Sequence, residues 1–140
     1  MGDAVEIARR YDDAFNAHDV EGRRAVLSDD SELWMPGGMR LQGPDQIIGM
    51  VQAFWQALPD GKLIQERHIS DGTDVATEGR LEGTHTGPFP SPQGDIPPTG
   101  NRVEFGYASL RRIEGDAIVS EHLYFDQLEF LQQIGALPGQ

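Results

Sequence analysis

The sequence predicts an α+β fold in which N-terminal helices cover one face of a curved antiparallel sheet. Two observations predict it. Apolar residues recur at helical spacing in two segments before residue 60, whereas residues 62–125 alternate between apolar and polar side chains and are interrupted by short turn signals. A last amphipathic segment follows these strands. Helices, then a run of strands, then a closing helix are typical of a single α+β layer, and 140 residues form one domain, residues 1–140.

The first helix is predicted from Asp3 to about Asn16. Asp3 and Glu6 form a capping-box pattern, and the apolar stripe that follows consists of Ile7, Tyr11, Ala14 and Phe15. Asp19 can cap a second, short helix. Its apolar residues are Val20 and residues 25–27, and residues 28–30 end it.

Residues 31–35 have the content of a strand, which Pro36-Gly37-Gly38 stops. Gly43-Pro44 starts a helix with proline in the first turn, and its buried stripe is Ile47, Val51, Phe54 and Leu58. Strands are then predicted at residues 62–70 and 73–85, joined by an Asp71-Gly72 hairpin. Five prolines and two glycines make residues 88–100 a long loop, which we expect to act as a flap over a ligand pocket.

The C-terminal hairpin organises the prediction. Strands at 102–112 and 116–125 flank a three-residue turn, so that Tyr107 faces Glu121 and Phe105 faces Leu123. Odd positions share the more apolar face, over which a ligand cavity is expected; they are Val103, Phe105, Tyr107, Ser109, Val119, Glu121, Leu123 and Phe125. Asp126 caps the closing helix in another capping-box pattern, and Gly135 ends it.

Composition narrows the class of protein. With 11 basic and 23 acidic residues, the net charge of −12 disfavours nucleic acids and anionic membranes as partners. No cysteine is present, and the four histidines form no metal-binding spacing, so neither a metal nor a cofactor is expected. The absence of a signal-like start and of an apolar run near 18 residues predicts a soluble, cytoplasmic protein.

Four short motifs carry a resemblance to a known family. They are Gly83-Thr84-His85-Thr86-Gly87, Pro97-Pro98-Thr99-Gly100, Glu114-Gly115 and Leu131-Gln132-Gln133-Ile134-Gly135. Over nearly the whole chain the sequence resembles the SnoaL-like polyketide cyclases, whose superfamily includes ketosteroid isomerase, limonene epoxide hydrolase and nuclear transport factor 2. The resemblance implies a cone-shaped shell with a deep apolar pocket between the sheet and the N-terminal helices.

The family's catalytic residues are not retained. The resemblance places the histidine and the aspartate of the aldol cyclases at Ser109 and Leu123, neither of which can move a proton at neutral pH. Ketosteroid isomerase matches through its helix-one tyrosine, which corresponds to Tyr11, whereas its base falls at Met35 and its second acid near Ala108.

A third relative supplies a further alternative. Arg80-Leu81-Glu82 is similar to the Arg-x-Asp pair of limonene epoxide hydrolase, but its last-strand acid again falls at Leu123. An epoxide hydrolase variant that uses Arg80 and Glu82 therefore lacks a partner to activate water.

Glu121 is the remaining candidate base, with Tyr11 and Tyr107 as hydroxyl donors. Burial in apolar surroundings would tune this carboxylate for proton transfer. Two structural alternatives stay open: Glu121 lies near the open end of the pocket and pairs with Arg111 or solvent, and Tyr11 only packs in the core. The residues expected to line the pocket are Phe15, Trp34, Met50, Phe54, His85, Phe105, Ser109 and Leu123.

These observations predict a cofactor-independent isomerase, cyclase or lyase that acts on a hydrophobic carbonyl or polycyclic compound. A non-catalytic binding protein of the same fold is the alternative that the loss of both family residues favours. The even face of the hairpin exposes Leu110, His122 and Tyr124 without a predicted helix to cover them, which predicts a homodimer packed through that face.

Overall fold

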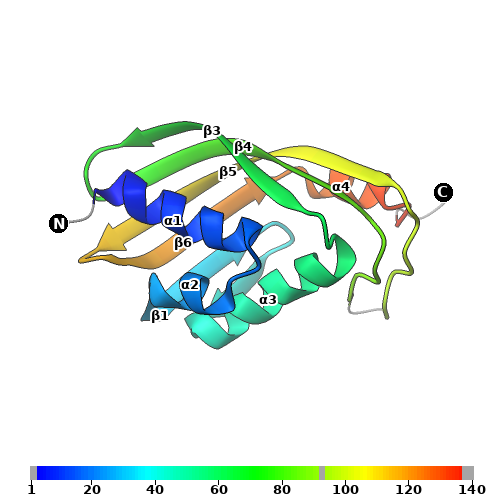
Figure 1. The fold of residues 1–140 in the computed structure, drawn as a ribbon, viewed down its shortest axis with the longest axis horizontal. Helices are drawn as coiled ribbons and strands as arrows, with labels where there is room; N and C mark the ends of the chain where they lie inside the picture. The colour runs from blue at the N-terminus through cyan, green and yellow to red at the C-terminus, as the bar shows by residue number, and fades with distance from the viewer. Residues whose placement is uncertain (1–2, 92–93, 137–140) are drawn as a thin grey trace.

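The computed structural model describes residues 3–91 and 94–136 and has the predicted α+β architecture. One curved, open sheet forms the frame, and the N-terminal helices lie across its inner face (Figure 1). The helices are α1 (Ala4–Asn16), α2 (Val20–Ala25), α3 (Gly43–Ala57) and α4 (Gln127–Gln133). The strands are β1 (Leu27–Met35), β2 (Met39–Gln42), β3 (Lys62–Ser70), β4 (Asp74–Thr84), β5 (Arg102–Glu114) and β6 (Ala117–Phe125).

Short polar caps begin three of the helices where the sequence predicts them. The carboxylates of Asp3, Asp19 and Asp126 accept hydrogen bonds from the first-turn amides of α1, α2 and α4 at 3.2, 2.9 and 3.1 Å. Each cap satisfies an amide that has no partner within its helix. Pro44 stands in the first turn of α3 instead, as predicted. Among the described helices, none is both long enough and apolar enough to span a membrane.

The strand order is β2-β1-β6-β5-β4-β3. All neighbours are antiparallel except β1 and β6, which are parallel, so the sheet is mixed rather than purely antiparallel. β1 begins at Leu27, because the apolar residues expected to extend the second helix start this strand. β2 was not expected at all, since it has only four residues and follows a glycine turn.

The predicted register of the C-terminal hairpin is wrong by four residues. Tyr107 pairs with Phe125, Ser109 with Leu123 and Arg111 with Glu121. β5 continues to Glu114, which shortens the turn to two residues, and a bulge adds one residue to β6. The total shift is even, so odd positions beyond the bulge still face inward. At the bulge itself, Ile118 replaces Val119 in the core and is 1% exposed.

The loop after β4 is held more firmly than its composition suggests. His85 and Gly100 join its two ends through a 2.8 Å bond between the Gly100 N–H and the His85 carbonyl. The backbones of Phe89 and Ile96 exchange two hydrogen bonds of 2.9 and 2.7 Å. Gly87 lies so close to the Gln56 carbonyl at the end of α3 that a side chain would collide with it.

Candidate functional site

An interior cavity of about 70 Å³ lies between the inner face of the sheet and the helices. Its walls are mostly apolar and include Phe15, Val51, Phe54, Leu81, Phe105 and Leu123. Polar side chains meet on one part of its lining, namely Arg23, Tyr107, Ser109, Arg111 and Glu121. Glu121 and Tyr107, two of the predicted catalytic residues, therefore share one cavity.

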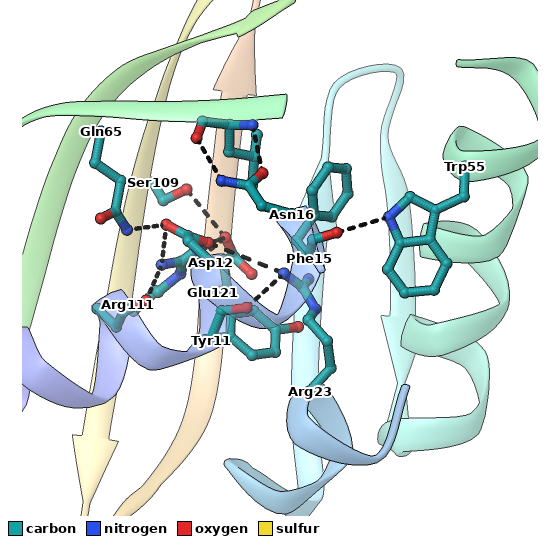
Figure 2. A network of polar contacts seen from close by, with 12 residues as sticks. Tyr11, Asp12, Phe15, Asn16, Arg23, Trp55, Gln65, Ser109, Arg111 and Glu121 are labelled. Carbon is teal, nitrogen blue, oxygen red and sulfur yellow. Dashed lines mark hydrogen bonds and ion pairs between the residues drawn. The ribbon is translucent and has the colours of Figure 1, made fainter. Parts of the chain in front are cut away.

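The lining continues behind the cavity into a buried polar network (Figure 2). Asp12 lies on the inward side of α1 and is 1% exposed. Its carboxylate accepts hydrogen bonds from Arg111 Nη2 at 2.8 Å, from Arg111 Nη1 at 3.1 Å and from Gln65 Nε2 at 2.5 Å. Asp12 thus joins α1 to β5 and β3.

Arg111 also holds Glu121, its cross-strand neighbour. Arg111 Nε donates to Glu121 Oε2 at 3.0 Å, and Ser109 Oγ donates to the same oxygen at 3.0 Å. All the described polar contacts of Glu121 pass through Oε2. The other carboxylate oxygen is therefore available to a ligand in the cavity.

Electrostatics keep Asp12 and Arg111 ionised. Burial alone would raise the pKa of Asp12, but the charge and hydrogen bonds of Arg111, with the charge of Arg23, lower it below its usual value. Burial opposes the charge of Arg111 as well, yet Asp12 and Glu121 together raise the Arg111 pKa well above its usual value. Arg111 thus remains a cation beside Glu121.

Arg23 brings a second buried cation to the cavity from α2. Its guanidinium lies over the Tyr11 ring, 3.5 Å from the centroid, and Nη1 donates to the Tyr11 carbonyl at 3.2 Å. Nη1 is also 3.9 Å from Asp12 Oδ1. Arg23 is 5% exposed, and its buried Nε–H has no hydrogen-bond partner among the described residues, which makes it a candidate donor to a ligand oxygen.

Tyr107 supplies the second free donor. It pairs with Gly79 of β4, and its hydroxyl lies only 3.0 Å from where a Cβ on Gly79 would be. The same Cβ would lie too close to the Ile64 carbonyl oxygen, so a side chain at Gly79 would collide with this backbone as well as with the Tyr107 ring. The hydroxyl is buried and has no hydrogen-bond partner among residues 3–91 and 94–136, and burial raises the Tyr107 pKa, so it remains a protonated donor.

Three predicted site residues do not line the cavity. Tyr11 packs in the core; its buried hydroxyl has no partner in the described part of the chain, and burial raises its pKa. Trp34 lies on the outer face, 38% exposed and stacked on His122 at 5.2 Å, because even positions of β1 point away from the helices. The remaining candidates, Phe15, Met50, Phe54, Phe105, Ser109 and Leu123, do line it.

His85 is the third correction. It is fully buried at the base of the loop, where Nδ1 accepts the Thr99 N–H at 3.3 Å and lies 3.0 Å from Thr99 Oγ1. Burial lowers its pKa, which favours the neutral ring that can accept this bond. His85 therefore anchors the loop and does not contact the cavity.

The epoxide hydrolase pair is also misplaced. Arg80 and Glu82 occupy even positions of β4, which face outward. Arg80 Nη1 forms an ion pair of 2.7 Å with Glu82 there, and a second ion pair of 3.1 Å with Glu104. Neither residue lines the cavity, so the structure contradicts a hydrolase site built on them. Ser109 and Leu123 do line it and are direct cross-strand neighbours.

A larger hollow of about 800 Å³ lies outside the inner cavity. Met35, Met50, Phe54 and Phe125 line both spaces, which makes the hollow a vestibule. The described part of the loop, including Phe89 and Ile96, forms one of its walls. A ligand too large for the inner cavity can extend into this apolar space.

Sequence reasoning missed Asp12 and Arg23 as site residues and placed Arg111 only as a possible partner of Glu121. Asp12 falls on the apolar stripe of α1, one residue after Tyr11 and three before Phe15. A charged residue on a buried stripe needs a buried partner, so its position could have identified it as a site residue. Arg111 stands at an odd position of β5, and odd positions face inward. Nothing in the short segment around Arg23 distinguishes it from the half-buried Arg24.

Comparisons with known proteins agree with this fold. A family model described as SnoaL-like polyketide cyclase matches residues 5–134. A candidate SnoaL-like polyketide cyclase from Jannaschia sp. CCS1 is 20% identical, with 96% of this chain and 92% of that chain covered at a TM-score of 0.84. IdmH, a candidate polyketide cyclase from Streptomyces antibioticus, is 24% identical over 94% of this chain and 97% of its own, with a TM-score of 0.78.

AclR, a candidate hydroxylase from Streptomyces galilaeus, shares the fold at a TM-score of 0.80 and 20% identity, over 94% of this chain and 84% of its own. No curated protein matches the chain significantly. At these identities the solved structures establish the fold, and the family model establishes the relationship.

Proposed function

The chain belongs to the SnoaL-like polyketide cyclase family, because the family model spans residues 5–134, and from this premise we propose that it is an acid–base enzyme acting on a hydrophobic carbonyl compound. The observation that supports the proposal is the lining of the inner cavity. There Glu121, Tyr107 and Arg23 line a single apolar space, and among the described residues one Glu121 oxygen, the Tyr107 hydroxyl and the Arg23 Nε–H have no hydrogen-bond partner. These are the groups that proton transfer next to a carbonyl requires.

In the proposed step, the free oxygen of Glu121 removes a proton from the carbon beside the substrate carbonyl. The C–H electron pair moves into an enolate, whose oxygen accepts hydrogen bonds from Tyr107 and from Arg23 Nε. Glu121 then returns the proton to another carbon, which is an isomerisation. Alternatively the enolate carbon attacks a second carbonyl, and the new alkoxide takes the proton, which closes a ring. Neither route uses a cofactor.

The surroundings of Glu121 restrict the substrate. Arg111 and Ser109 both donate hydrogen bonds to one oxygen of Glu121, and a carboxylate base suits a substrate whose C–H group is itself acidic, as between two carbonyl groups. The inner cavity admits only the reacting end of a polycyclic molecule, and the apolar vestibule suits the remainder. A poly-carbonyl compound with a large apolar body fits both spaces.

The experiment begins with a thermal-shift screen of steroids and aromatic polyketides, followed by conversion assays on every compound that binds. Glu121→Gln keeps the size of the side chain and removes the proton acceptor. We expect near-wild-type affinity with turnover reduced by about 10²–10⁴-fold, the usual contribution of one general base. Glu104→Gln is the control, because Glu104 lies on the outer face.

Unchanged turnover in Glu121→Gln would eliminate Glu121 as the base. Ligands that bind without conversion by either protein would instead support a second function, a non-catalytic binding protein. One observation favours that alternative: the family's acid position is Leu123, an apolar wall residue of the cavity.

A further inference from the structure

Asp12 is a buried carboxylate that the proposed reaction leaves without a role. It is 1% exposed on the inward side of α1, yet it does not line the inner cavity, whereas Arg111 and Glu121 do. Burial of an ionised carboxylate costs stability unless cations and hydrogen bonds compensate it. Asp12 lies behind the cavity wall, so it can act on a ligand site only through its contacts with Arg111.

Arg111 presents two edges of its guanidinium, and Asp12 occupies the edge formed by the two terminal nitrogens (Figure 2). Nη2 donates to Asp12 Oδ1 at 2.8 Å and Nη1 donates to Oδ2 at 3.1 Å, so each carboxylate oxygen accepts one bond. Nη1 also donates to the Ala8 carbonyl of the same helix at 3.4 Å. Gln65 Nε2 donates to Asp12 Oδ2 from β3 at 2.5 Å. The contacts with α1 therefore fix the guanidinium in one orientation.

Glu121 receives the other edge of the guanidinium through a single oxygen. Arg111 Nε donates to Glu121 Oε2 at 3.0 Å, and Nη2 lies 3.0 Å from the same atom. Ser109 Oγ donates to Oε2 as well, at 3.0 Å. A guanidinium and a carboxylate frequently form two parallel hydrogen bonds, one to each oxygen. Asp12 has this bidentate pair with Arg111, and Glu121 does not.

The charge of Arg111 is shared in the same unequal way. Burial works against this cation, and Asp12 contributes more than Glu121 to the rise in the Arg111 pKa that offsets it. A general base must have an oxygen within hydrogen-bond reach of the proton that it removes. With Asp12 as the stronger partner of Arg111, Glu121 keeps such an oxygen.

We propose that Asp12 is a positioning residue: it takes the two terminal nitrogens of Arg111, so that Glu121 keeps one oxygen free for the substrate proton. The inference rests on the proposed function, in which Glu121 is the base. In Asp12→Asn, an amide N–H replaces one of the two acceptor oxygens that face Arg111. The guanidinium then loses its bidentate partner on α1 and turns toward Glu121, whose two oxygens bind it.

Alkylation of Glu121 tests this proposal without a known substrate. The probe is phenyl glycidyl ether, whose aryl group suits the apolar vestibule. The free carboxylate oxygen attacks the terminal epoxide carbon and forms an ester bond. The bond between this carbon and the epoxide oxygen breaks, and the oxygen takes a proton from water. We expect peptide mass spectrometry to find the ester on Glu121 and not on Asp12 in the wild-type protein.

Asp12→Asn should slow this alkylation by about tenfold or more per folded molecule, because both Glu121 oxygens are then bound to Arg111. The matched control is Asp13→Asn, an exposed neighbour on the same helix, which should react at the wild-type rate. Glu121→Gln should abolish the ester. An unchanged rate in Asp12→Asn, a wild-type ester on Asp12, or absence of the ester from wild-type Glu121 would each overturn the proposal.

A second variant separates positioning from simple charge compensation. Asp12→Asn combined with Gln65→Glu returns one carboxylate to the network, since Gln65 already contacts Asp12, but it leaves the terminal nitrogens of Arg111 without a bidentate partner. Urea denaturation should show recovered stability while alkylation of Glu121 stays slow. Recovery of the alkylation rate together with stability would reduce Asp12 to charge compensation and overturn the proposal. Alkylation requires no turnover, so this result is separate from the test of the proposed function, which depends on turnover in Glu121→Gln.

Discussion

Arg111 compensates two buried carboxylates at once, and this determines how Glu121 is presented to the cavity. Asp12 and Glu121 come from α1 and β6, and the guanidinium between them is 3% exposed. Removing one partner from such a buried pair typically costs about 3–5 kcal/mol, because the other charge remains uncompensated. The network therefore fixes the Glu121 side chain in one orientation before any ligand arrives.

Tyr107 allows a residue-scale prediction in which stability and catalysis change in opposite directions. Its buried hydroxyl has no partner, and an unsatisfied buried polar group costs about 1–3 kcal/mol. Tyr107→Phe should leave the free energy of unfolding unchanged or raise it slightly, as urea denaturation will measure. Turnover of an identified substrate should fall by about 10²-fold, because an oxyanion donor is lost.

The control for this change is Tyr124→Phe on the exposed outer face, which should alter neither quantity. If Tyr107→Phe destabilised the protein while turnover per folded molecule stayed constant, the hydroxyl would have a structural role only. That result would remove Tyr107 from the proposed site and leave Glu121 to be judged by its own variant.

At the scale of single residues, the sequence predicted which site residues face inward better than it predicted their hydrogen-bond and ion-pair partners. Alternation alone placed Glu121, Tyr107 and Ser109 on the cavity side, because the period of a strand is two. Asp12 could not be connected to Arg111 in the same way, since 99 residues separate them and only the tertiary fold brings α1 onto β5.

At the scale of elements, the hairpin shows why faces are easier to predict than registers. Gly115 has a positive φ of 62°, which allows a two-residue turn. β5 therefore extends to Glu114, further than a three-residue turn permits. The bulge after Arg112 adds the fourth residue of the shift. Since the sum is even, the predicted face survives although every predicted pair is wrong.

The loop expected to act as a flap permits a prediction at the same scale, based on its described residues, 88–91 and 94–100. Phe89 packs edge-on against Phe54 and Phe130 at 5.4 Å each, so the flap is fastened to the wall of the vestibule. Phe89→Ala removes both contacts, and amide exchange of Ile96 should accelerate about tenfold or more, because truncating even a half-buried Phe costs more than about 1.4 kcal/mol. A bound ligand should slow exchange there in the wild-type protein.

Amides at the centre of β5, such as Tyr107, provide the internal control and should exchange equally in both proteins. Equal exchange of Ile96 in the variant would mean that the backbone pair with Phe89 suffices to hold the flap. If the amide exchange of Ile96 were unchanged when a ligand saturates the cavity, the flap would not close on ligands.

On the scale of the whole molecule, the sequence predicted the α+β class and the helical cover over the inner face. It did not predict that β1 inserts beside β6 as a parallel neighbour. That pairing joins segments some 90 residues apart, and no local turn signal exists for such a contact. Turn residues therefore predict the order of the strands along the chain, but they do not predict the order of the strands across the sheet.

The net charge of −12 supplies the last prediction, which concerns self-association through the outer face. Two copies repel each other at long range, whereas the outer face, through which the sequence predicts a homodimer, exposes Leu110 and Tyr124 and pairs its charges locally. Salt shortens the Debye length from about 30 Å at 0.01 M to about 8 Å at 0.15 M. Raising the salt concentration over this range should therefore strengthen the dimer several-fold in sedimentation equilibrium. Association driven by opposite charges would weaken with salt instead, and that outcome would contradict an apolar, charge-neutral interface.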